Sequence, residues 1–195
     1  AFSGSITAYS GNLTVTDTSL SVDDINTLDS ATSGTVDVSA VATLTGTVSA
    51  LNSAYASDGI TGLGNEAITI SDTSLSVSGL NTLDGNTTGS IDASTITAFT
   101  GTASALNTAY ASDGITGLGN EAATLTDTNL SVSVLNTLDS NTTGSIDAST
   151  ITAFTGTVSA LNSAYTSDGI TGLVNETVTL TDTNLSVSGL NTLDS

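Results

Sequence analysis

The sequence predicts a repeat solenoid, in which parallel β-strands from successive coils stack side by side. An aliphatic residue followed by Asn recurs seven times, and the gaps, counted in residues, alternate between 26 and 29, so the full repeat is 55 long. We therefore expect about seven coils in a single array over residues 1–195. The recurring dipeptides are Ile25-Asn26, Leu51-Asn52, Leu80-Asn81, Leu106-Asn107, Leu135-Asn136, Leu161-Asn162 and Leu190-Asn191.

Composition narrows the range of functions. The chain contains no Lys, Arg, His, Cys, Met, Trp or Pro, and its 19 acidic residues give a net charge of −19. Without cationic side chains it forms no internal salt bridge and is a poor partner for the phosphates of nucleic acids. The lack of Cys excludes disulfides and thiolate-bound zinc. No apolar run approaches about 18 residues, so we expect no membrane span.

A short strand is predicted in each coil by a Thr-aliphatic-Thr pattern, in which Ser replaces the second Thr once. Side chains alternate along a strand, so the aliphatic residue points inward and both hydroxyls point outward. We expect these strands to stack in parallel, about 4.8 Å apart, over a continuous aliphatic core. The pattern occupies residues 14–16, 69–71, 95–97, 124–126, 150–152 and 179–181, with 40–42 as an Ala-Val-Ala exception.

The segment after each strand shows apolar residues three apart, which is typical of one face of a short helix. Thr100 and Thr102, or Asp127-Thr128, are candidate N-caps. Residues 75–79 alternate instead, which indicates a strand. A leucine-rich-repeat-like coil with one short helix and an all-β three-sided helix therefore both remain open. The apolar triplets include Val77, Leu80 and Leu83; Ala103, Leu106 and Ala109; Val132, Leu135 and Leu138; and Val158, Leu161 and Ala164.

One acidic residue stands the same number of positions before each recurring Leu in the sequence, as Asp37 does before Leu51 and Glu66 before Leu80. Coils stacked in this register would align these carboxylates about 5 Å apart. Like charges at that spacing repel, and bound cations would relieve the repulsion. Oxygen-only ligands favour Ca²⁺. A solvated acidic edge with splayed side chains is the alternative. The row consists of Asp37, Glu66, Asp92, Glu121, Asp147 and Glu176.

Two loops resemble the first half of an EF-hand loop, with acidic or amide residues at positions one, three and nine and Gly at position six. The candidate ligands are Asp84, Asn86 and Asp92 in one loop and Asp139, Asn141 and Asp147 in the other. Both loops have Thr, not the bidentate Glu, at position twelve, at Thr95 and Thr150. We therefore expect weak calcium binding at most, and an Asx turn ending in Gly is the alternative.

Other recurring side chains have structural explanations. The repeated Asn residues are expected to form an amide ladder that satisfies backbone groups in turns, and Tyr55, Tyr110 and Tyr165 are expected to pack within the shorter coils. The Thr pairs resemble the ice-binding face of some antifreeze proteins, although Thr is also a common exposed strand residue. The sequons at Asn86 and Asn141 permit glycan attachment. With no His, Cys or Lys available as base or nucleophile, we expect no enzyme activity.

The N-terminal segment departs from the repeat. Residues 5–11 are similar to the strand region 95–101, yet they run directly into residues 12–15 without the segment that should intervene. Residues 1–12 are therefore expected to be a degenerate first coil or a junction.

The motifs ITGLGNEA, LNTLDSNTTG and SIDASTITAFTG resemble tandem repeats of very large secreted bacterial proteins, particularly cyanobacterial ones, that are grouped with haemolysin-type calcium-binding proteins and adhesins. The resemblance implies an extracellular or cell-surface location. The chain lacks the glycine–aspartate nonapeptides of calcium rolls, so those calcium sites are not carried over. We expect a structural rod or filament that assembles with copies of itself and is stiffened by Ca²⁺. A calcium-dependent adhesin spacer and an ice-binding solenoid are the alternatives.

Overall fold

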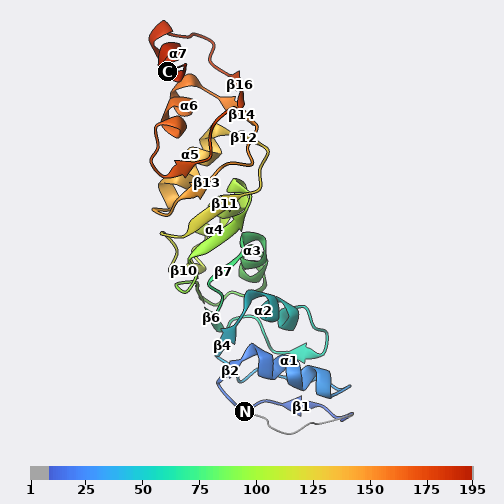
Figure 1. Cartoon of the computed structure of the whole chain (residues 1–195). Helices are drawn as coiled ribbons and strands as arrows, with labels where there is room; N and C mark the ends of the chain where they lie inside the picture. The colour runs from blue at the N-terminus through green and yellow to red at the C-terminus, as the bar shows by residue number, and fades with distance from the viewer. Residues whose placement is uncertain (1–8, 195) are drawn as a thin grey trace. The chain divides into compact units, whose positions relative to one another are not determined.

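The computed structural model describes residues 9–194 (Figure 1), and the chain divides into two compact units by its internal contacts. The first unit extends to Thr73 and also includes Ser78–Ile96 and Ser112–Gly117. The second comprises Ser74–Val77, Thr97–Ala111 and the chain from Leu118 onward. Most of the expected degenerate segment, residues 1–8, lies outside the described residues. A single array over the whole chain stays a prediction.

Helices and short strands alternate along the described chain, which confirms the helix-containing coil over the all-β alternative. Seven helices occur within residues 9–194. They are α1 (Val22–Ala31), α2 (Val48–Tyr55), α3 (Val77–Asn86), α4 (Ala103–Ala111), α5 (Val132–Asn141), α6 (Val158–Tyr165) and α7 (Val187–Leu193). Short coils, such as α1 to α2, place two strands between their helices, whereas long coils, such as α4 to α5, place three.

The strands pair in parallel throughout the described part of the chain. The first unit contains one three-stranded sheet, β1-β3-β5, and one five-stranded sheet, β10-β8-β6-β4-β2. These strands are β1 (Leu13–Thr14), β2 (Ser19–Ser21), β3 (Val36–Asp37), β4 (Thr43–Gly46), β5 (Ile60–Thr61), β6 (Ala67–Ile70), β8 (Ile91–Asp92) and β10 (Ile115–Thr116). This repeating pattern of parallel strands and helices is compatible with a repeat solenoid, and it is not a closed barrel.

The second unit repeats this design. Its five-stranded sheet has the order β15-β13-β11-β9-β7, and its three-stranded sheet has the order β12-β14-β16. The strands are β7 (Ser74–Ser76), β9 (Ala98–Gly101), β11 (Ala122–Leu125), β12 (Asn129–Ser131), β13 (Ile146–Asp147), β14 (Ala153–Gly156), β15 (Ile170–Thr171) and β16 (Thr177–Leu180). Each strand of the second five-stranded sheet begins one full repeat after its counterpart in the first, as β7 does after β2.

From one coil to the next, paired strand residues are separated by fewer positions in the sequence than equivalent residues of successive helices are. Ser19 pairs with Thr43, and Thr43 pairs with Ala67, so two register steps lead from Ser19 to Ala67. The counterpart of Ser19 in the next repeat is Ser74, which lies further along the chain than Ala67. Each repeat therefore starts a new sheet, and within residues 9–194 no sheet contains a strand from every coil.

Because paired strands are closer in sequence than successive helices, some of the Thr-aliphatic-Thr segments that were predicted as strands lie outside them. In long coils the pattern coincides with the end of a strand, because Thr69-Ile70 closes β6 and Thr124-Leu125 closes β11. In short coils, residues 95–97 and 150–152 lie in the turn region between β8 and β9 and between β13 and β14. The prediction assumed that strands and helices repeat with the same spacing, which they do not.

The core is built from the predicted apolar triplets. Val132, Leu135 and Leu138 of α5 are fully buried, as is the smaller set Ala103, Leu106 and Ala109 of α4. Hydroxyl residues begin the helices, as N-caps do in general. Thr102 accepts a hydrogen bond from the Ala105 amide, and Thr157 accepts one from the Ala160 amide. The amphipathic spacing and the caps together explain why helices as short as α2 form here.

We predict that Gly101→Ala destabilises the chain by about 1–3 kcal/mol, because overpacking forces neighbouring atoms to shift. A Cβ added at Gly101, at the end of β9, would lie 2.6 Å from Cγ1 of Val77. Denaturant unfolding measures the change. Adding Val77→Ala should recover part of the loss. Gly85→Ala is the matched control, because nothing lies within 4 Å of its added Cβ and it should stabilise α3. Equal losses at both glycines would contradict the packing explanation.

Candidate functional site

Two carboxylates are buried in the described chain without any cation to neutralise them. Glu66 is 1 % exposed and Glu121 is not exposed. Both Glu121 oxygens accept hydrogen bonds from the Gly119 amide, at 3.1 and 2.9 Å, and Oε2 also accepts one from the Tyr110 hydroxyl at 2.8 Å. Glu66 makes the same bonds with Gly64 and Tyr55. Neutral donors therefore take the place of the missing counterions.

Ring packing as well as a hydrogen bond holds two of the recurring tyrosines, Tyr110 and Tyr165. The Tyr110 and Phe99 rings meet edge to face, with centroids 6.4 Å apart, and Tyr165 meets Phe154 in the same way. Burial, followed by the hydrogen bond and negative charge of Glu121, raises the pKa of Tyr110 far above its usual value. Burial also raises the pKa of Tyr55. The tyrosines thus do pack within the short coils, and they also bind the Glu of the following long coil.

Tyr165 and Glu176 form a third tyrosine–glutamate pair, which is less buried than the other two. Glu176 accepts hydrogen bonds from the Val174 amide and the Tyr165 hydroxyl, each at 2.8 Å, but its side chain is half-buried. The Glu121 copy is covered by the next coil, where the Thr142 hydroxyl donates to the Glu121 carbonyl at 3.0 Å. The burial of each Glu therefore depends on the coil that follows it.

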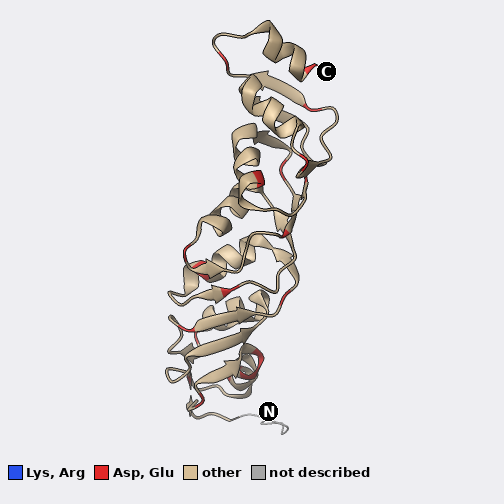
Figure 2. Cartoon of the chain, turned by 90° about the vertical axis from the view of Figure 1, so that its left-hand side faces the viewer, with Lys and Arg blue, Asp and Glu red and all other residues tan. Residues whose placement is uncertain are grey.

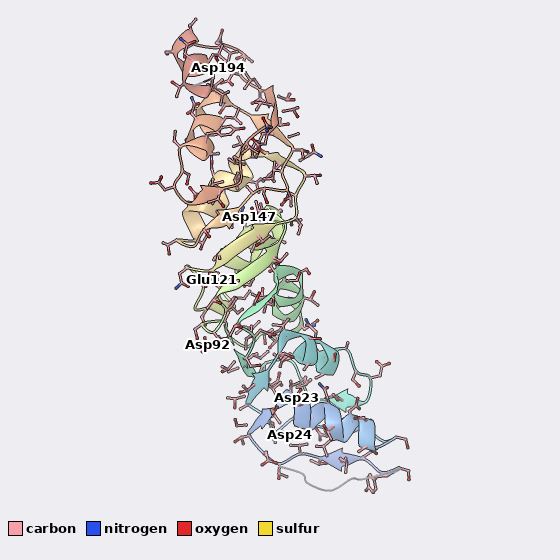
Figure 3. The ribbon with its side chains drawn as sticks, viewed as in Figure 1. Asp23, Asp24, Asp92, Glu121, Asp147 and Asp194 are labelled. Atoms are coloured by element: carbon pink, nitrogen blue, oxygen red, sulfur yellow. The ribbon has the colours of Figure 1, made fainter. Side chains whose placement is uncertain are left out.

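The structure does not bring the six expected carboxylates into one row. Asp92 lies opposite Thr69 and Thr116, and Asp147 lies opposite Thr124 and Thr171, so hydroxyl residues separate the carboxylates. Asp37 likewise lies opposite Thr14 and Thr61. Asp92, Glu121 and Asp147 are labelled in Figure 3. The expected alignment is wrong because it required strand register to advance as far per coil as the helices do.

The three aspartates of that expected row each cap a turn of their own. Asp37, Asp92 and Asp147 accept hydrogen bonds from the amides of Ser39, Ser94 and Ser149, at 3.0 Å in each case. Hydrogen bonds from the Ser94 side chain and amide lower the pKa of Asp92, and those from Ser149 lower the pKa of Asp147. The Ser39 bonds lower the pKa of Asp37. These carboxylates stay ionised and satisfied without a cation.

The candidate calcium ligands are divided between different elements. Asp84 and Asn86 lie in the last turn of α3, whereas Asp92 ends β8. Asp84 accepts a bond from the Ser112 hydroxyl at 2.9 Å, and the Asn86 amide donates to Asn52. In the second loop, Asp139 accepts from the Ser167 hydroxyl and the Asn141 amide donates to Asn107. Within residues 9–194, no group of three or more acidic, His or Cys side chains is placed to hold a metal ion. Calcium binding stays a prediction.

The repeated Asn residues form an interhelical ladder, although they do not bond to turns as expected. Asn26, Asn52, Asn107, Asn136 and Asn162 each donate the side-chain amide to a carbonyl of the next helix, as from Asn107 to Val134 at 3.0 Å and from Asn136 to Ala160 at 2.9 Å. Asn52 donates to Gly79 in the same way. The ladder therefore joins successive helices and fixes their register.

Sequence reasoning missed a set of aspartates that cap helices of the preceding coil. Asp72, Asp127 and Asp182 accept hydrogen bonds from the first amides of α2, α4 and α6, at 2.8, 2.8 and 2.9 Å. Asp127 was expected to cap the helix that follows it, yet it caps α4 instead. The regular recurrence of Asp-Thr at 72, 127 and 182 was the available signal. It did not say which helix each aspartate meets.

The last described coil exposes a face that earlier coils bury. Val187 is 74 % exposed and Leu190 is 36 % exposed, whereas their counterparts Val132 and Leu135 are fully buried. Val174 and Leu185 are also exposed. In the preceding repeat, the following coil covers this surface.

We predict that Tyr110→Phe destabilises the chain by about 1–3 kcal/mol, because it leaves a buried carboxylate with one donor fewer. Denaturant unfolding checks this value. Tyr165→Phe is the matched control and should cost less, since Glu176 is partly solvated. Combining Tyr110→Phe with Glu121→Gln should reduce the loss because the buried charge is removed. A larger loss for Tyr165→Phe than for Tyr110→Phe would contradict this account.

We also predict an alkaline step in stability. Burial, the hydrogen bond to Glu176 and the charge of Glu176 raise the pKa of Tyr165 to about 12. The unfolded value is about 10, so the stabilisation is complete below about pH 10 and is lost as the pH rises towards about 12. An absorbance titration of the folded chain should show this phenol ionising near pH 12, and Tyr165→Phe should remove that step. Ionisation of Tyr165 at its ordinary, unfolded value would contradict the assignment.

No helix in the described part of the chain is long and apolar enough to cross a membrane. Figure 2 shows that acidic residues are distributed along both units. Comparison with known proteins finds no matching family model, no matching curated protein and no matching solved structure. The functional argument therefore depends on the chain's own contacts.

Proposed function

We propose that the chain is a structural segment of an extracellular rod, filament, sheath or surface layer. In this proposal it is one stretch of a parallel solenoid of about seven coils, in which short and long coils alternate. The observation that carries the proposal is the set of bonds that join one coil to the next, such as those from the Ala103 amide to Asp127 and from Asn136 to Ala160. Coils that are stabilised by their neighbours can form an array that extends lengthwise.

The way each coil depends on the next supports this role. Helix caps, the Asn ladder and the cover over each buried Glu all join one coil to its neighbour. These contacts recur with the repeat, as the hydrogen bond from Ser112 to Asp84 does between Ser167 and Asp139. Contacts that repeat without variation suit a scaffold, whereas an active site requires a place where the repeat changes. The proposal therefore assigns the chain a mechanical role and not a catalytic one.

Calcium is an additional part of the proposal. Metal ions would stiffen the array if Asp84, Asp92, Asp139 or Asp147 gained ligands from neighbouring chains. The negative charge and the oxygen-only ligand set favour Ca²⁺ over transition metals. Lateral association of the acidic chains would need such cations, because like charges otherwise repel.

The test is a chain lengthened by one repeat, made by inserting a second copy of residues 85–139 after Asp139. Electron microscopy of the purified original and lengthened chains, with calcium and with EDTA, measures their dimensions. We expect the lengthened chain to form a longer rod of unchanged width in both conditions. Rods that form with calcium but are lost in EDTA would assign the carboxylates as metal ligands. An increase in width without an increase in length would contradict the structural role.

A further inference from the structure

We propose that α2, α4 and α6, which we call the short-coil helices, each select the helix that follows by the size of one pair of facing side chains. The following helices, α3, α5 and α7, are called the long-coil helices. The pair joins the first residue of a short-coil helix to the third residue of the next helix. The pairs are Val48 with Gly79, Ala103 with Val134, and Val158 with Gly189. This inference goes beyond the proposed function, because it concerns which coils can be neighbours.

One hydrogen bond fixes the third residue of each long-coil helix at the same place. The carbonyl of that residue accepts a bond from the fifth residue of the short-coil helix, which is an Asn that lies one turn after the first residue and on the same face. The bonds are Asn52 to Gly79 at 2.9 Å, Asn107 to Val134 at 3.0 Å and Asn162 to Gly189 at 3.3 Å. The three pairs are therefore structurally equivalent.

Two of the pairs combine a valine with a glycine at close range. A Cβ added to Gly79 would lie 3.2 Å from Cγ1 of Val48, and one added to Gly189 would lie 3.1 Å from Cγ1 of Val158. Both valines are buried. Since even one added carbon would be closer than ordinary packing allows, a larger side chain at either glycine would force the helices to shift. These junctions therefore require a glycine on the long-coil helix.

The middle pair has the reverse combination. Val134 of α5 occupies the place of the glycines, and its side chain is half-buried. The facing helix α4 begins with Ala103, which is fully buried and lacks the Cγ atoms that Val48 and Val158 bring to this contact. The smaller residue on α4 therefore leaves room for the larger one on α5. Each of the three junctions thus pairs one bulky residue with one small residue.

The recurring hydrogen bonds do not distinguish one long coil from another. The Asn bond recurs at all three junctions, and so does the bond from a Tyr hydroxyl to a Glu carboxylate. The first turns of α3 and α5 read Val-Ser-Gly-Leu and Val-Ser-Val-Leu, so they differ only at the third residue. In the other type of junction, where a short coil follows a long coil, Gly46, Gly101 and Gly156 always meet a Val. The size pair is therefore what distinguishes the α4–α5 junction.

The partner that each short-coil helix fits follows from its first residue. Val48 and Val158 fit a long-coil helix with Gly at its third position, whereas Ala103 fits one with Val. Nearly identical repeats are prone to misassembly and to exchange between chains. Placing α5 on α2 would press Val134 against Val48, and placing α3 on α4 would leave a void over Ala103. The pairs therefore favour the native order of coils over exchange with another repeat or a second copy.

A double-mutant cycle at the α4–α5 junction tests the inference. Ala103→Val gives α4 the first residue of α2, and Val134→Gly gives α5 the first turn of α3. In denaturant unfolding, we expect Ala103→Val alone to lower the equilibrium constant for folding by about tenfold or more, because Val would meet Val. The double variant should exceed the stability expected from the two single effects by about fivefold or more in that constant. A coupling of zero, or an unfavourable one, would overturn the inference.

Two further cycles keep the result specific to the facing pair. Ser104→Val adds the same side chain to the exposed side of α4 and should show no coupling to Val134→Gly. Equal coupling there would overturn the assigned contact. Gly79→Val should destabilise the α2–α3 junction, and adding Val48→Ala should recover part of the loss, since the two together reproduce the pair of Ala103 and Val134. Failure to recover any of it would also contradict the inference.

The inference and the structural role can fail independently. The cycles measure the stability of the folded chain and do not depend on rods or calcium. Rods that lengthen as proposed, in a chain without coupling between Ala103 and Val134, would overturn this inference alone. Coupling in a chain whose lengthened form gains no length would contradict the structural role alone.

Discussion

The carboxylates of this chain have no Lys, Arg or His with which to pair, and many of those in the described part bond to neutral donors instead. Backbone amides and hydroxyls supply the bonds, and many of them come from a neighbouring coil. Asp127 binds the first amide of α4, and Asp139 binds the hydroxyl of Ser167. Glu121 is buried only because the following coil covers it. The same contacts therefore stack the coils and supply hydrogen bonds to their carboxylates. A coil without its neighbour would lose both the packing and these bonds.

The elements that depend on spacing alone were predictable from the sequence. The apolar triplets became the buried faces of α4 and α5, because an amphipathic helix is recognised from its helical periodicity alone. Parallel pairing followed from the repeat, since equivalent segments of stacked coils run in the same direction. Thr102 was recognised as a helix cap from its position before an apolar run. These features are local, or they are fixed by the period.

Features that depend on register between coils were not predictable in this way. Strand register advances less per coil than the helices do, so Asp147 lies opposite Thr124 and Thr171, and the expected row of carboxylates does not form. Asp127 was assigned to the wrong helix because its partner, the amide of Ala103, lies in the preceding coil. Burial of Glu121 could not be foreseen, because a carboxylate without a cation is normally exposed. Only the positions of the Gly119 amide and the Tyr110 hydroxyl explain it.

The most direct measurement of this account is the coupling energy between Asp139 and Ser167, whose side chains meet across two coils at 2.8 Å. A double-mutant cycle with Asp139→Asn and Ser167→Ala, followed by denaturant unfolding, isolates their interaction. The account predicts a favourable coupling of about 0.5–1.5 kcal/mol, which should persist in EDTA because the Ser167 hydroxyl bonds directly to the Asp139 carboxylate. A coupling of zero, or one that disappears when divalent cations are removed, would contradict the claim that neutral donors of the neighbouring coil satisfy these carboxylates.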